Sequence, residues 1–337
     1  MSINPVEIPI GAVRYNTDSN KMEVYIGSTW MEVAVSSPNL DGGGRGIFSG
    51  GATPSVVNTL DFVTISTAGN ATDFGDLLTV LRGHADLADR TRGLTAGGDA
   101  PGIVDTINFI TISSTGNSQD FGDLTSGRDY LAGVNNPTRG IIAGGWGPSR
   151  SNVIEFVTIQ STGDAVDFGD LTEAQQTDGS FSSPTRGFFV GGAAGPGPAY
   201  QATTTGTQIE CVTTTSLGNA FDFGDLLNGT YGKVGASNSI RGLAGGGVGS
   251  PANIVALELL TMATLGNTTN FGDMTNSHYY GGGTSDPTRA IFGGGSPGPN
   301  NIIDYVNIAT QGDAVDFGDL TQARHTLKAM SNANGGL

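Results

Sequence analysis

The segment Ala-Val-Asp-Phe-Gly-Asp-Leu at residues 165–171 decides the fold, because its central four residues recur along the chain. Asp-Phe-Gly-Asp is found at 73–76, 120–123, 167–170, 222–225 and 316–319, and Asn-Phe-Gly-Asp at 270–273. The phenylalanines of these six copies are 47, 47, 55, 48 and 46 residues apart. Self-similarity at a near-constant period of this length is the signature of a repeat architecture. The chain is therefore predicted to contain six structural repeats.

A second marker accompanies each copy of the motif. It is an arginine followed by a small residue, a short apolar run and two glycines, as in Arg-Gly-Ile-Ile-Ala-Gly-Gly at 139–145. The repeats are thus predicted to start near residues 45, 92, 139, 186, 241 and 289, at Arg45, Arg92, Arg139, Arg186, Arg241 and Arg289.

Each repeat shows strand and turn signals without a helical stretch. In the third repeat, residues 139–145 and 152–159 are rich in β-branched side chains, and 165–171 follows after a turn. Gly, Pro, Asn and Ser separate these runs, and a more variable segment extends through about 184. Four strands in about 47 residues match the blade of a β-propeller. An all-β fold of six blades is the prediction.

The double glycines carry a resemblance to kelch repeats, whose blades have a glycine pair at the end of the second strand. At the fourth strand the chain departs from that family, which usually places Trp where this sequence has the motif phenylalanine. The resemblance implies a six-bladed, kelch-like β-propeller. Its glycine pairs are Gly50-Gly51, Gly97-Gly98, Gly144-Gly145, Gly191-Gly192, Gly245-Gly246 and Gly293-Gly294.

Kelch phasing makes a prediction about ring closure. The variable segment becomes the first strand of the following blade, so the chain enters its first blade at the second strand, 45–51. The C-terminal residues, about 324–332, are then left as an unpaired first strand. We expect this strand to complete the first blade and remove two open sheet edges. Residues 41–337 are accordingly predicted to form the propeller.

Residues 1–40 lie outside the repeats and are predicted to be a separate module. Residues 10–33 indicate three short strands, with turns at 17–20 and 27–29. A sheet of this size cannot bury a core alone, so it must pack on another surface. Its pattern, Gly-x-Val-Arg-Tyr-Asn-Thr followed by Tyr-x-Gly-x-x-Trp, resembles a module of tail-fibre and other structural proteins of tailed bacteriophages. The Gly-rich repeat resembles propeller repeats of the same class of phage, especially marine ones.

The resemblance implies a non-enzymatic structural protein of the virion, most of all a tail-associated fibre or nozzle component. Residues 1–40 would attach it to other virion proteins, in multiple copies per particle. The propeller would be displayed toward a host cell-surface glycan or protein. A head-decoration or collar protein is the alternative location, and a propeller glycan hydrolase is an alternative of a different class.

The composition and net charge of the chain argue against some classes of partner. The chain has 31 acidic and 15 basic residues, a net charge of −16, and no basic stripe, so nucleic acid is not an expected partner. No apolar run approaches the roughly 18 residues of a spanning helix, so membrane insertion is not expected. No cofactor is predicted. The 55 glycines lack a three-residue period, which excludes collagen, and the single Cys211 is interpreted as a core residue.

The repeated polar residues are interpreted as architecture. Each Asp is expected to accept backbone N–H bonds in a turn, and one to pair with an arginine. Six Ca²⁺ sites are the alternative, although two carboxylates per motif are few for that ion. A three-histidine metal site at His84, His278 and His325 would require those residues to line a channel. The aspartates are Asp73, Asp76, Asp120, Asp123, Asp167, Asp170, Asp222, Asp225, Asp273, Asp316 and Asp319.

The loops after the double glycines differ among the repeats, and in the fourth repeat the loop extends over 193–207. All six loops should emerge on one face, where such variation indicates a contact surface, unless it reflects drift in a tolerant loop. The candidate contact residues are Trp146, Pro196, Pro198 and Tyr200, and Tyr279 and Tyr280 are further aromatics able to stack on sugars or anchor a protein.

Overall fold

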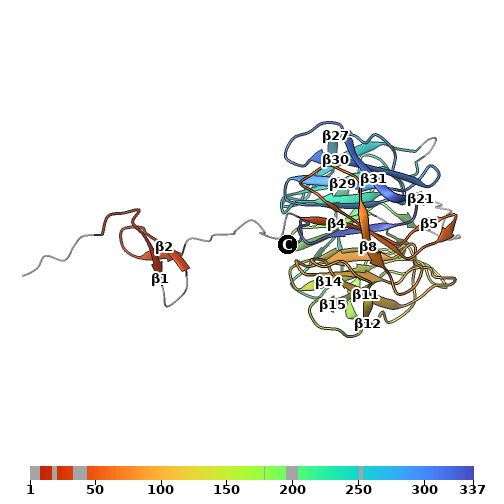
Figure 1. Cartoon of the computed structure of the whole chain (residues 1–337), viewed down its shortest axis with the longest axis horizontal. Helices are drawn as coiled ribbons and strands as arrows, with labels where there is room; N and C mark the ends of the chain where they lie inside the picture. The colour runs from red at the N-terminus through yellow and green to blue at the C-terminus, as the bar shows by residue number, and fades with distance from the viewer. Residues whose placement is uncertain (1–7, 17–20, 33–43, 178, 195–203, 250–252) are drawn as a thin grey trace, which may run out of the picture. The chain divides into compact units, whose positions relative to one another are not determined.

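A computed structural model of the chain describes residues 8–16, 21–32, 44–177, 179–194, 204–249 and 253–337 (Figure 1). The chain forms two compact units, Met1–Gly43 and Gly44–Leu337, here called the N-terminal unit and the repeat unit. Among the described residues all regular structure is β, which confirms the predicted all-β class.

The N-terminal unit contains one antiparallel sheet of order β1-β2-β3. As predicted, it has three short strands; the expected turn at 17–20 lies outside the described residues. One side of the sheet carries Val13, Tyr15, Met22 and Met31, all at least 40% exposed. The strands are β1 (Val13–Asn16), β2 (Lys21–Tyr25) and β3 (Trp30–Glu32).

The described part of the repeat unit contains six four-stranded antiparallel sheets. Five are formed by consecutive strands, and the sixth joins the two ends of the unit. The five are β9 (Ala85–Ala88), β10 (Arg92–Ala96), β11 (Thr106–Thr111) and β12 (Gln119–Asp123); β13 (Ala132–Asn135), β14 (Arg139–Ala143), β15 (Val153–Thr158) and β16 (Val166–Asp170); β18 (Gly179–Ser182), β19 (Arg186–Val190), β22 (Gln208–Thr213) and β23 (Phe221–Asp225); β24 (Val234–Ser237), β25 (Arg241–Gly245), β26 (Ala256–Thr261) and β27 (Thr269–Asp273); and β28 (Gly282–Ser285), β29 (Arg289–Gly293), β30 (Asn300–Asn307) and β31 (Val315–Arg324).

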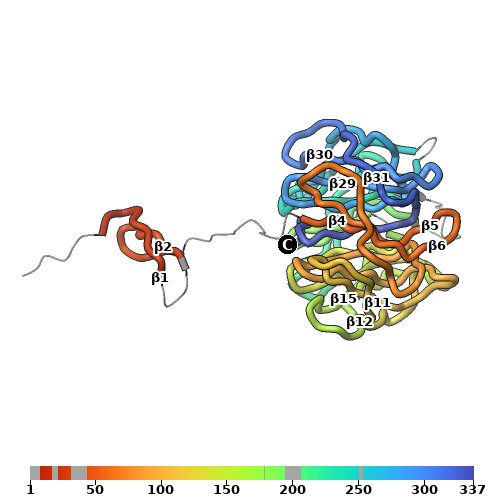
Figure 2. Tube along the Cα trace, viewed as in Figure 1, coloured from red at the N-terminus to blue at the C-terminus, as the bar shows by residue number. Residues whose placement is uncertain are grey.

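The joining sheet has the order β32-β4-β7-β8. Its C-terminal strand pairs antiparallel with the first strand of the repeat unit, so the predicted pairing is confirmed. In Figure 2 the orange start of the repeat unit runs beside the blue C-terminal end. Its strands are β32 (Lys328–Ser331), β4 (Arg45–Ser49), β7 (Thr59–Thr64) and β8 (Thr72–Asp76).

The predicted C-terminal strand was placed too early, at about residue 324. Arg324 instead ends β31, and β32 begins only at Lys328. Between the two strands Thr326 has a φ of 55°, which breaks an extended conformation. The repeat unit also contains two smaller sheets. One pairs β5 (Ala52–Thr53) with β6 (Ser55–Val56), and the other combines β17 (Gln175–Gln176), β20 (Ala193–Ala194) and β21 (Thr204–Thr205).

The first strands of the six sheets, β9, β13, β18, β24, β28 and β32, contact one another in that cyclic order, and β32 contacts β9 again. We call them the inner strands. Six apolar clusters fill the spaces between neighbouring sheets. One of them joins Phe48 and Ile65 of the first repeat to Ile291 and Phe317 of the last. The core is thus divided among the six sheet interfaces.

Candidate functional site

The Asp-Phe-Gly-Asp motifs lie on the outer strands and connect each repeat to the next. The contact between the second and third repeats shows the pattern. The N–H of Gly163 donates to the carbonyl of Phe121, at 2.8 Å, and the N–H of Asp123 donates to Oδ1 of Asp164, at 3.1 Å. The motif phenylalanines are buried, whereas most of the motif carboxylates are exposed. The equivalent pairs are Asp76–Asn117, Asp170–Asn219, Asp225–Asn267, Asp273–Asp313 and Asp319–Asn70, the last of which joins the sixth repeat to the first.

The six repeat arginines also reach into the following repeat. Arg92, for example, donates from Nη1 to the carbonyl of Ile159, at 3.2 Å, while its guanidinium lies 4.8 Å from the ring centroid of Phe109. Arg289 closes the series by donating to Ile65. The other donors and acceptors are Arg45 to Ile112, Arg139 to Thr214, Arg186 to Met262 and Arg241 to Ile308.

The expected ion pairs between these arginines and the motif aspartates are absent among the described residues. The carboxylates stay in water on the outer strands, where charge needs no partner, and the guanidinium groups satisfy turn carbonyls instead. Of the motif carboxylates, Asp222 alone accepts a backbone N–H from a described residue, Gly224.

Neither metal alternative gains support. In the described part of the chain, no three His, Cys, Asp or Glu residues are grouped so as to hold a metal ion. His278 contacts the carbonyl of Gly294 and the carboxylate of Asp304. His84 contacts Ser49, and His325 contacts the hydroxyl of its neighbour Thr326. The three histidines belong to three different sheets and do not converge.

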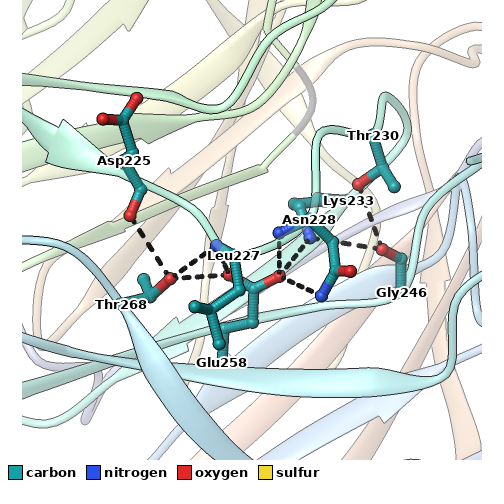
Figure 3. Close-up of polar contacts among 8 residues, drawn as sticks. All are labelled: Asp225, Leu227, Asn228, Thr230, Lys233, Gly246, Glu258 and Thr268. Carbon is teal, nitrogen blue, oxygen red and sulfur yellow. Dashed lines mark hydrogen bonds and ion pairs between the residues drawn. The ribbon is translucent and has the colours of Figure 1, made fainter.

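A buried acid lies on the third strand of most sheets, facing the segment before the inner strand. In Figure 3, Glu258 of β26 accepts hydrogen bonds from Leu227 N–H, Asn228 and Thr268, and pairs with Lys233 at 3.4 Å. Burial opposes ionisation of Glu258, but Lys233 and these donors outweigh it, so the pKa of Glu258 lies below its ordinary value.

The buried acid has its own basic partner in three other sheets: Arg324 pairs with Asp61, Arg128 pairs with Glu155, and Nε2 of His278 lies 3.0 Å from Oδ2 of Asp304. In another sheet, β11 carries the neutral Asn108 in place of the acid. The residue there that corresponds to Arg128 is the uncharged Leu81.

Glu210 of β22 is the exception. Its counterpart is the neutral Gln175. Oε2 of Glu210 has no hydrogen-bond partner within the described part of the chain, although the residue is fully buried. Burial raises the pKa of Glu210, and the hydrogen bonds from Thr172 only partly oppose this.

The six inner strands surround a central cavity of about 60 Å³, large enough for a few water molecules. Among its described lining residues the ionisable groups are Asp86 and Lys328. At one end the C-terminal segment crosses it, where the side-chain amides of Asn334 and Asn135 bond each other reciprocally at 3.1 Å. A Cβ on Gly335 would lie 2.5 Å from the carbonyl of Ser182, on the opposite inner strand, so the tail closes this end tightly.

Asp86 also belongs to a buried group with Ser49 and His84. The hydroxyl of Ser49 lies 2.7 Å from Nε2 of His84 and 2.5 Å from Oδ2 of Asp86. The composition is that of a hydrolytic triad, but the carboxylate contacts the serine and Nε2 of the histidine. Nδ1, which the acid of such a triad would contact, has no partner among the described residues. Burial lowers the pKa of His84 to about 3 and raises the pKa of Asp86 to about 8. This arrangement places a neutral histidine and a protonated acid in the core.

Before the other ends of the inner strands lie six equivalent residues, each two positions ahead of the first residue of an inner strand. Each is the seventh residue after the second aspartate of the preceding motif. Backbone hydrogen bonds link neighbours in the set, from Gly83 N–H to Thr326 O, Thr326 N–H to Tyr280 O and Tyr280 N–H to Gly232 O. We call this the double-glycine end, because the loops after the glycine pairs bridge to it. The six are Gly83, Tyr130, Thr177, Gly232, Tyr280 and Thr326.

Two of these residues carry large side chains in a strained backbone. Gly83 and Gly232 have φ values of 62° and 72°, which glycine adopts without steric strain. Tyr130 and Tyr280 adopt φ values of 51° and 56°, at a cost of about 1–2 kcal/mol each. Since glycine satisfies the same backbone elsewhere, the fold does not need tyrosine here.

The strained tyrosines meet across the axis. They precede β13 and β28, which lie opposite each other in the cyclic order, yet their ring centroids are 5.5 Å apart. Tyr231 and Tyr279 add to the same group, with centroids 6.1 Å and 5.8 Å from that of Tyr280. We call these four half-buried residues the tyrosine cluster.

Polar planar side chains border the tyrosine cluster on one side. Arg82 donates from Nε and Nη2 to Oδ2 of Asp99, at 2.9 Å and 2.6 Å, with the two side chains 39% and 21% exposed. Arg150 lies over the ring of Trp146, which bridges to the residue before Tyr130. Of the predicted contact residues, Trp146 lies at this end, and Pro196, Pro198 and Tyr200 lie outside the described residues.

Tyr279 and Tyr280 were among the predicted contact aromatics, whereas Tyr130 and Tyr231 were not. The shared spacing from the motif could have found Tyr130 beside Tyr280, whereas Tyr231 stands one position earlier. No protein-family model matches the chain, and no curated protein matches it. Among the described residues, no helix has the length and hydrophobicity needed to cross a membrane.

Proposed function

We propose that residues 44–337 form a six-bladed, kelch-like β-propeller in which each four-stranded sheet is a blade. The proposal is supported by the cyclic contacts of the inner strands and by bonds that return from the last repeat to the first. It is further supported by the sheet that combines β32 with β4, because this pairing leaves the first blade complete.

In this proposal the protein is a non-enzymatic structural component of a bacteriophage virion, associated with the tail as a fibre or nozzle part. The observation that carries the proposal is a contrast between two kinds of position in the repeats. Positions shared by all repeats bond neighbouring sheets together, while the positions that differ in chemistry converge at the double-glycine end. A symmetric frame that presents one asymmetric surface is suited to display and contact.

The N-terminal unit is the attachment piece in the same proposal. Its sheet leaves Val13, Tyr15 and Met31 exposed, whereas Arg14 on the other side is paired with Glu23 and lies over Trp30. A one-sided apolar sheet must be covered by another layer. Other virion proteins are the proposed cover.

A glycan hydrolase is less well supported. The cavity of about 60 Å³ is too small for a sugar ring, and the group of Ser49, His84 and Asp86 has neither the geometry nor the exposure of a catalytic triad. A head-decoration or collar protein shares the display role and differs only in location.

Immunogold electron microscopy of purified particles tests the function. Label at the tail is expected. Label at the head or neck would move the protein to decoration or collar duty, and particles without label would overturn the virion assignment.

A further inference from the structure

We propose that the tyrosine cluster is a binding platform for a neutral saccharide of the host surface. The inference rests on the proposed display function and names the ligand chemistry of the same double-glycine end. It begins from Tyr130 and Tyr280, which occupy a left-handed backbone that Gly83 and Gly232 occupy without strain. Strain retained where folding does not require it points to a role for the side chain itself.

The geometry of the cluster suits the flat face of a sugar. Tyr130 and Tyr280 approach from opposite inner strands, and Tyr231 and Tyr279 extend the surface beside them. All four are half-buried, so their rings are held by packing while part of each residue remains accessible to solvent. A pyranose ring has a face rich in C–H groups, which packs against aromatic faces of this kind.

The side chains that border the tyrosine cluster include both hydrogen-bond donors and hydrogen-bond acceptors. Arg82 offers N–H donors and Asp99 offers carboxylate oxygens, and both side chains are partly exposed. His325 lies close enough to Arg82 for that charge to lower its pKa, in addition to the larger effect of burial. Paired donors and acceptors beside an apolar platform match adjacent hydroxyls, each of which both donates and accepts.

Charge and topology argue against the competing ligand classes. The protein carries a net charge of −16, which disfavours a polyanion. An extended peptide needs an open sheet edge or a groove, but the inner strands here contact neighbours on both sides. The charged pair Arg82–Asp99 beside the tyrosines is less suited to an apolar protein hot spot than to a polyhydroxylated ligand.

Calorimetric titration of the full chain with cellohexaose, chitohexaose, maltohexaose and mannohexaose tests the proposal. Wild type is expected to bind at least one of them, and Tyr280→Gly is expected to weaken that binding by about tenfold or more. Glycine is compatible with the backbone at this position, so this variant should fold. Phe221→Ala, at an exposed aromatic on the outer strand β23, is the matched control and should bind as wild type does.

Two results would overturn the saccharide assignment: no binding of any of the four probes, or equal binding by Tyr280→Gly. Protease treatment of host cells separates the other source of contact, because it removes surface proteins and leaves polysaccharides in place. Cell attachment that depends on Tyr280 and is lost after protease treatment would assign the platform to a protein partner and overturn the proposal. Gold label on particles together with absent saccharide binding would leave the display function standing.

Discussion

The circumference and the axis of the repeat unit are built from the same six repeats but follow different rules. On the circumference, the backbone N–H of the second motif aspartate donates six times to Oδ1 of an Asn or Asp in the next repeat, as Asp123 does to Asp164 and Asp319 does to Asn70. Toward the axis, the segment between the motif and the inner strand changes from one repeat to the next. It carries Arg128 in one sheet, Lys233 in another and Gln175 in a third.

The difference teaches where to look for function in a symmetric protein. The repeated bonds hold neighbouring sheets together. They are alike because each sheet packs against its neighbour in the same way. A ligand that binds once requires residues that occur once. Those residues collect at the double-glycine end, where Tyr130, Tyr280 and the pair Arg82–Asp99 lie.

Removal of residues 324–337 should have the largest effect. The truncation takes away β32 and leaves β4 with an open edge, and it strips the buried Asp61 of Arg324. Loss of one partner of a buried ion pair alone costs about 3–5 kcal/mol. We expect aggregation and no cooperative melting, measured by sedimentation and by circular dichroism. A soluble product with unchanged melting would contradict the closing role of β32.

The buried acids should respond to neutralisation with opposite signs. Glu258→Gln leaves Lys233 buried without its counter-charge and should destabilise the protein by about 3 kcal/mol. Glu210→Gln removes a buried carboxylate that lacks a cation and should stabilise it by about 1 kcal/mol at pH 8. Urea unfolding of both variants measures this. Losses of similar size in the two would show that Glu210 has a charge partner after all.

The Glu210 effect should depend on pH. The raised pKa means that the folded state holds its proton more tightly than the unfolded state, so wild-type stability falls as pH rises above about 4.5. The advantage of Glu210→Gln should therefore shrink as the pH is lowered toward that value.

Two glycines with the same backbone conformation test the repeat-to-repeat contact. Gly122 and Gly163 have φ values of 151° and 152°, so alanine strains both equally. A Cβ at Gly122 would lie 2.5 Å from the backbone of Gly163, but a Cβ at Gly163 would meet nothing within 4 Å. Gly122→Ala should cost about 1–3 kcal/mol more than Gly163→Ala in chemical unfolding. Equal costs would mean that the circumference is looser than the bonds indicate.

A pH-dependent effect on stability is also expected at Asp86. Its pKa of about 8 exceeds the unfolded value of 3.8, so folding takes up a proton between these values and wild-type stability declines as pH rises through them. Asp86→Asn should gain stability relative to wild type from pH 6.5 to pH 9. Nε2 of His84 lies 3.4 Å from Oδ1 of Asp86, so the comparison stays above about pH 6.5, where the lowered pKa of His84 does not affect stability. Parallel stability curves would refute the buried, protonated state of Asp86.

The sequence allowed the repeats, the strand order within them and the pairing of the C-terminal strand to be predicted, because a period and its phase are read directly from residue spacing. The partners of the repeat arginines could not be predicted. Arg92 reaches a carbonyl of Ile159, and a carbonyl acceptor leaves no trace in residue type.

The tyrosine cluster was also beyond prediction from spacing alone. Tyr130 and Tyr280 are three repeats apart in the chain, and only the closed cyclic order brings opposite inner strands to within ring contact. Likewise, the Asn334–Asn135 pair depends on where the C-terminal tail crosses the axis, which no pattern in the sequence marks.

Attachment of purified, fluorescently labelled protein to host cells tests the central claim most directly. The double variant Tyr130→Gly/Tyr280→Gly alters the axis, and Asp120→Asn/Asp167→Asn alters exposed carboxylates of the circumference. We predict that wild type and the circumference variant attach equally and that the axis variant does not. Full attachment by the axis variant, with loss in the circumference variant, would contradict the assignment of contact to the double-glycine end.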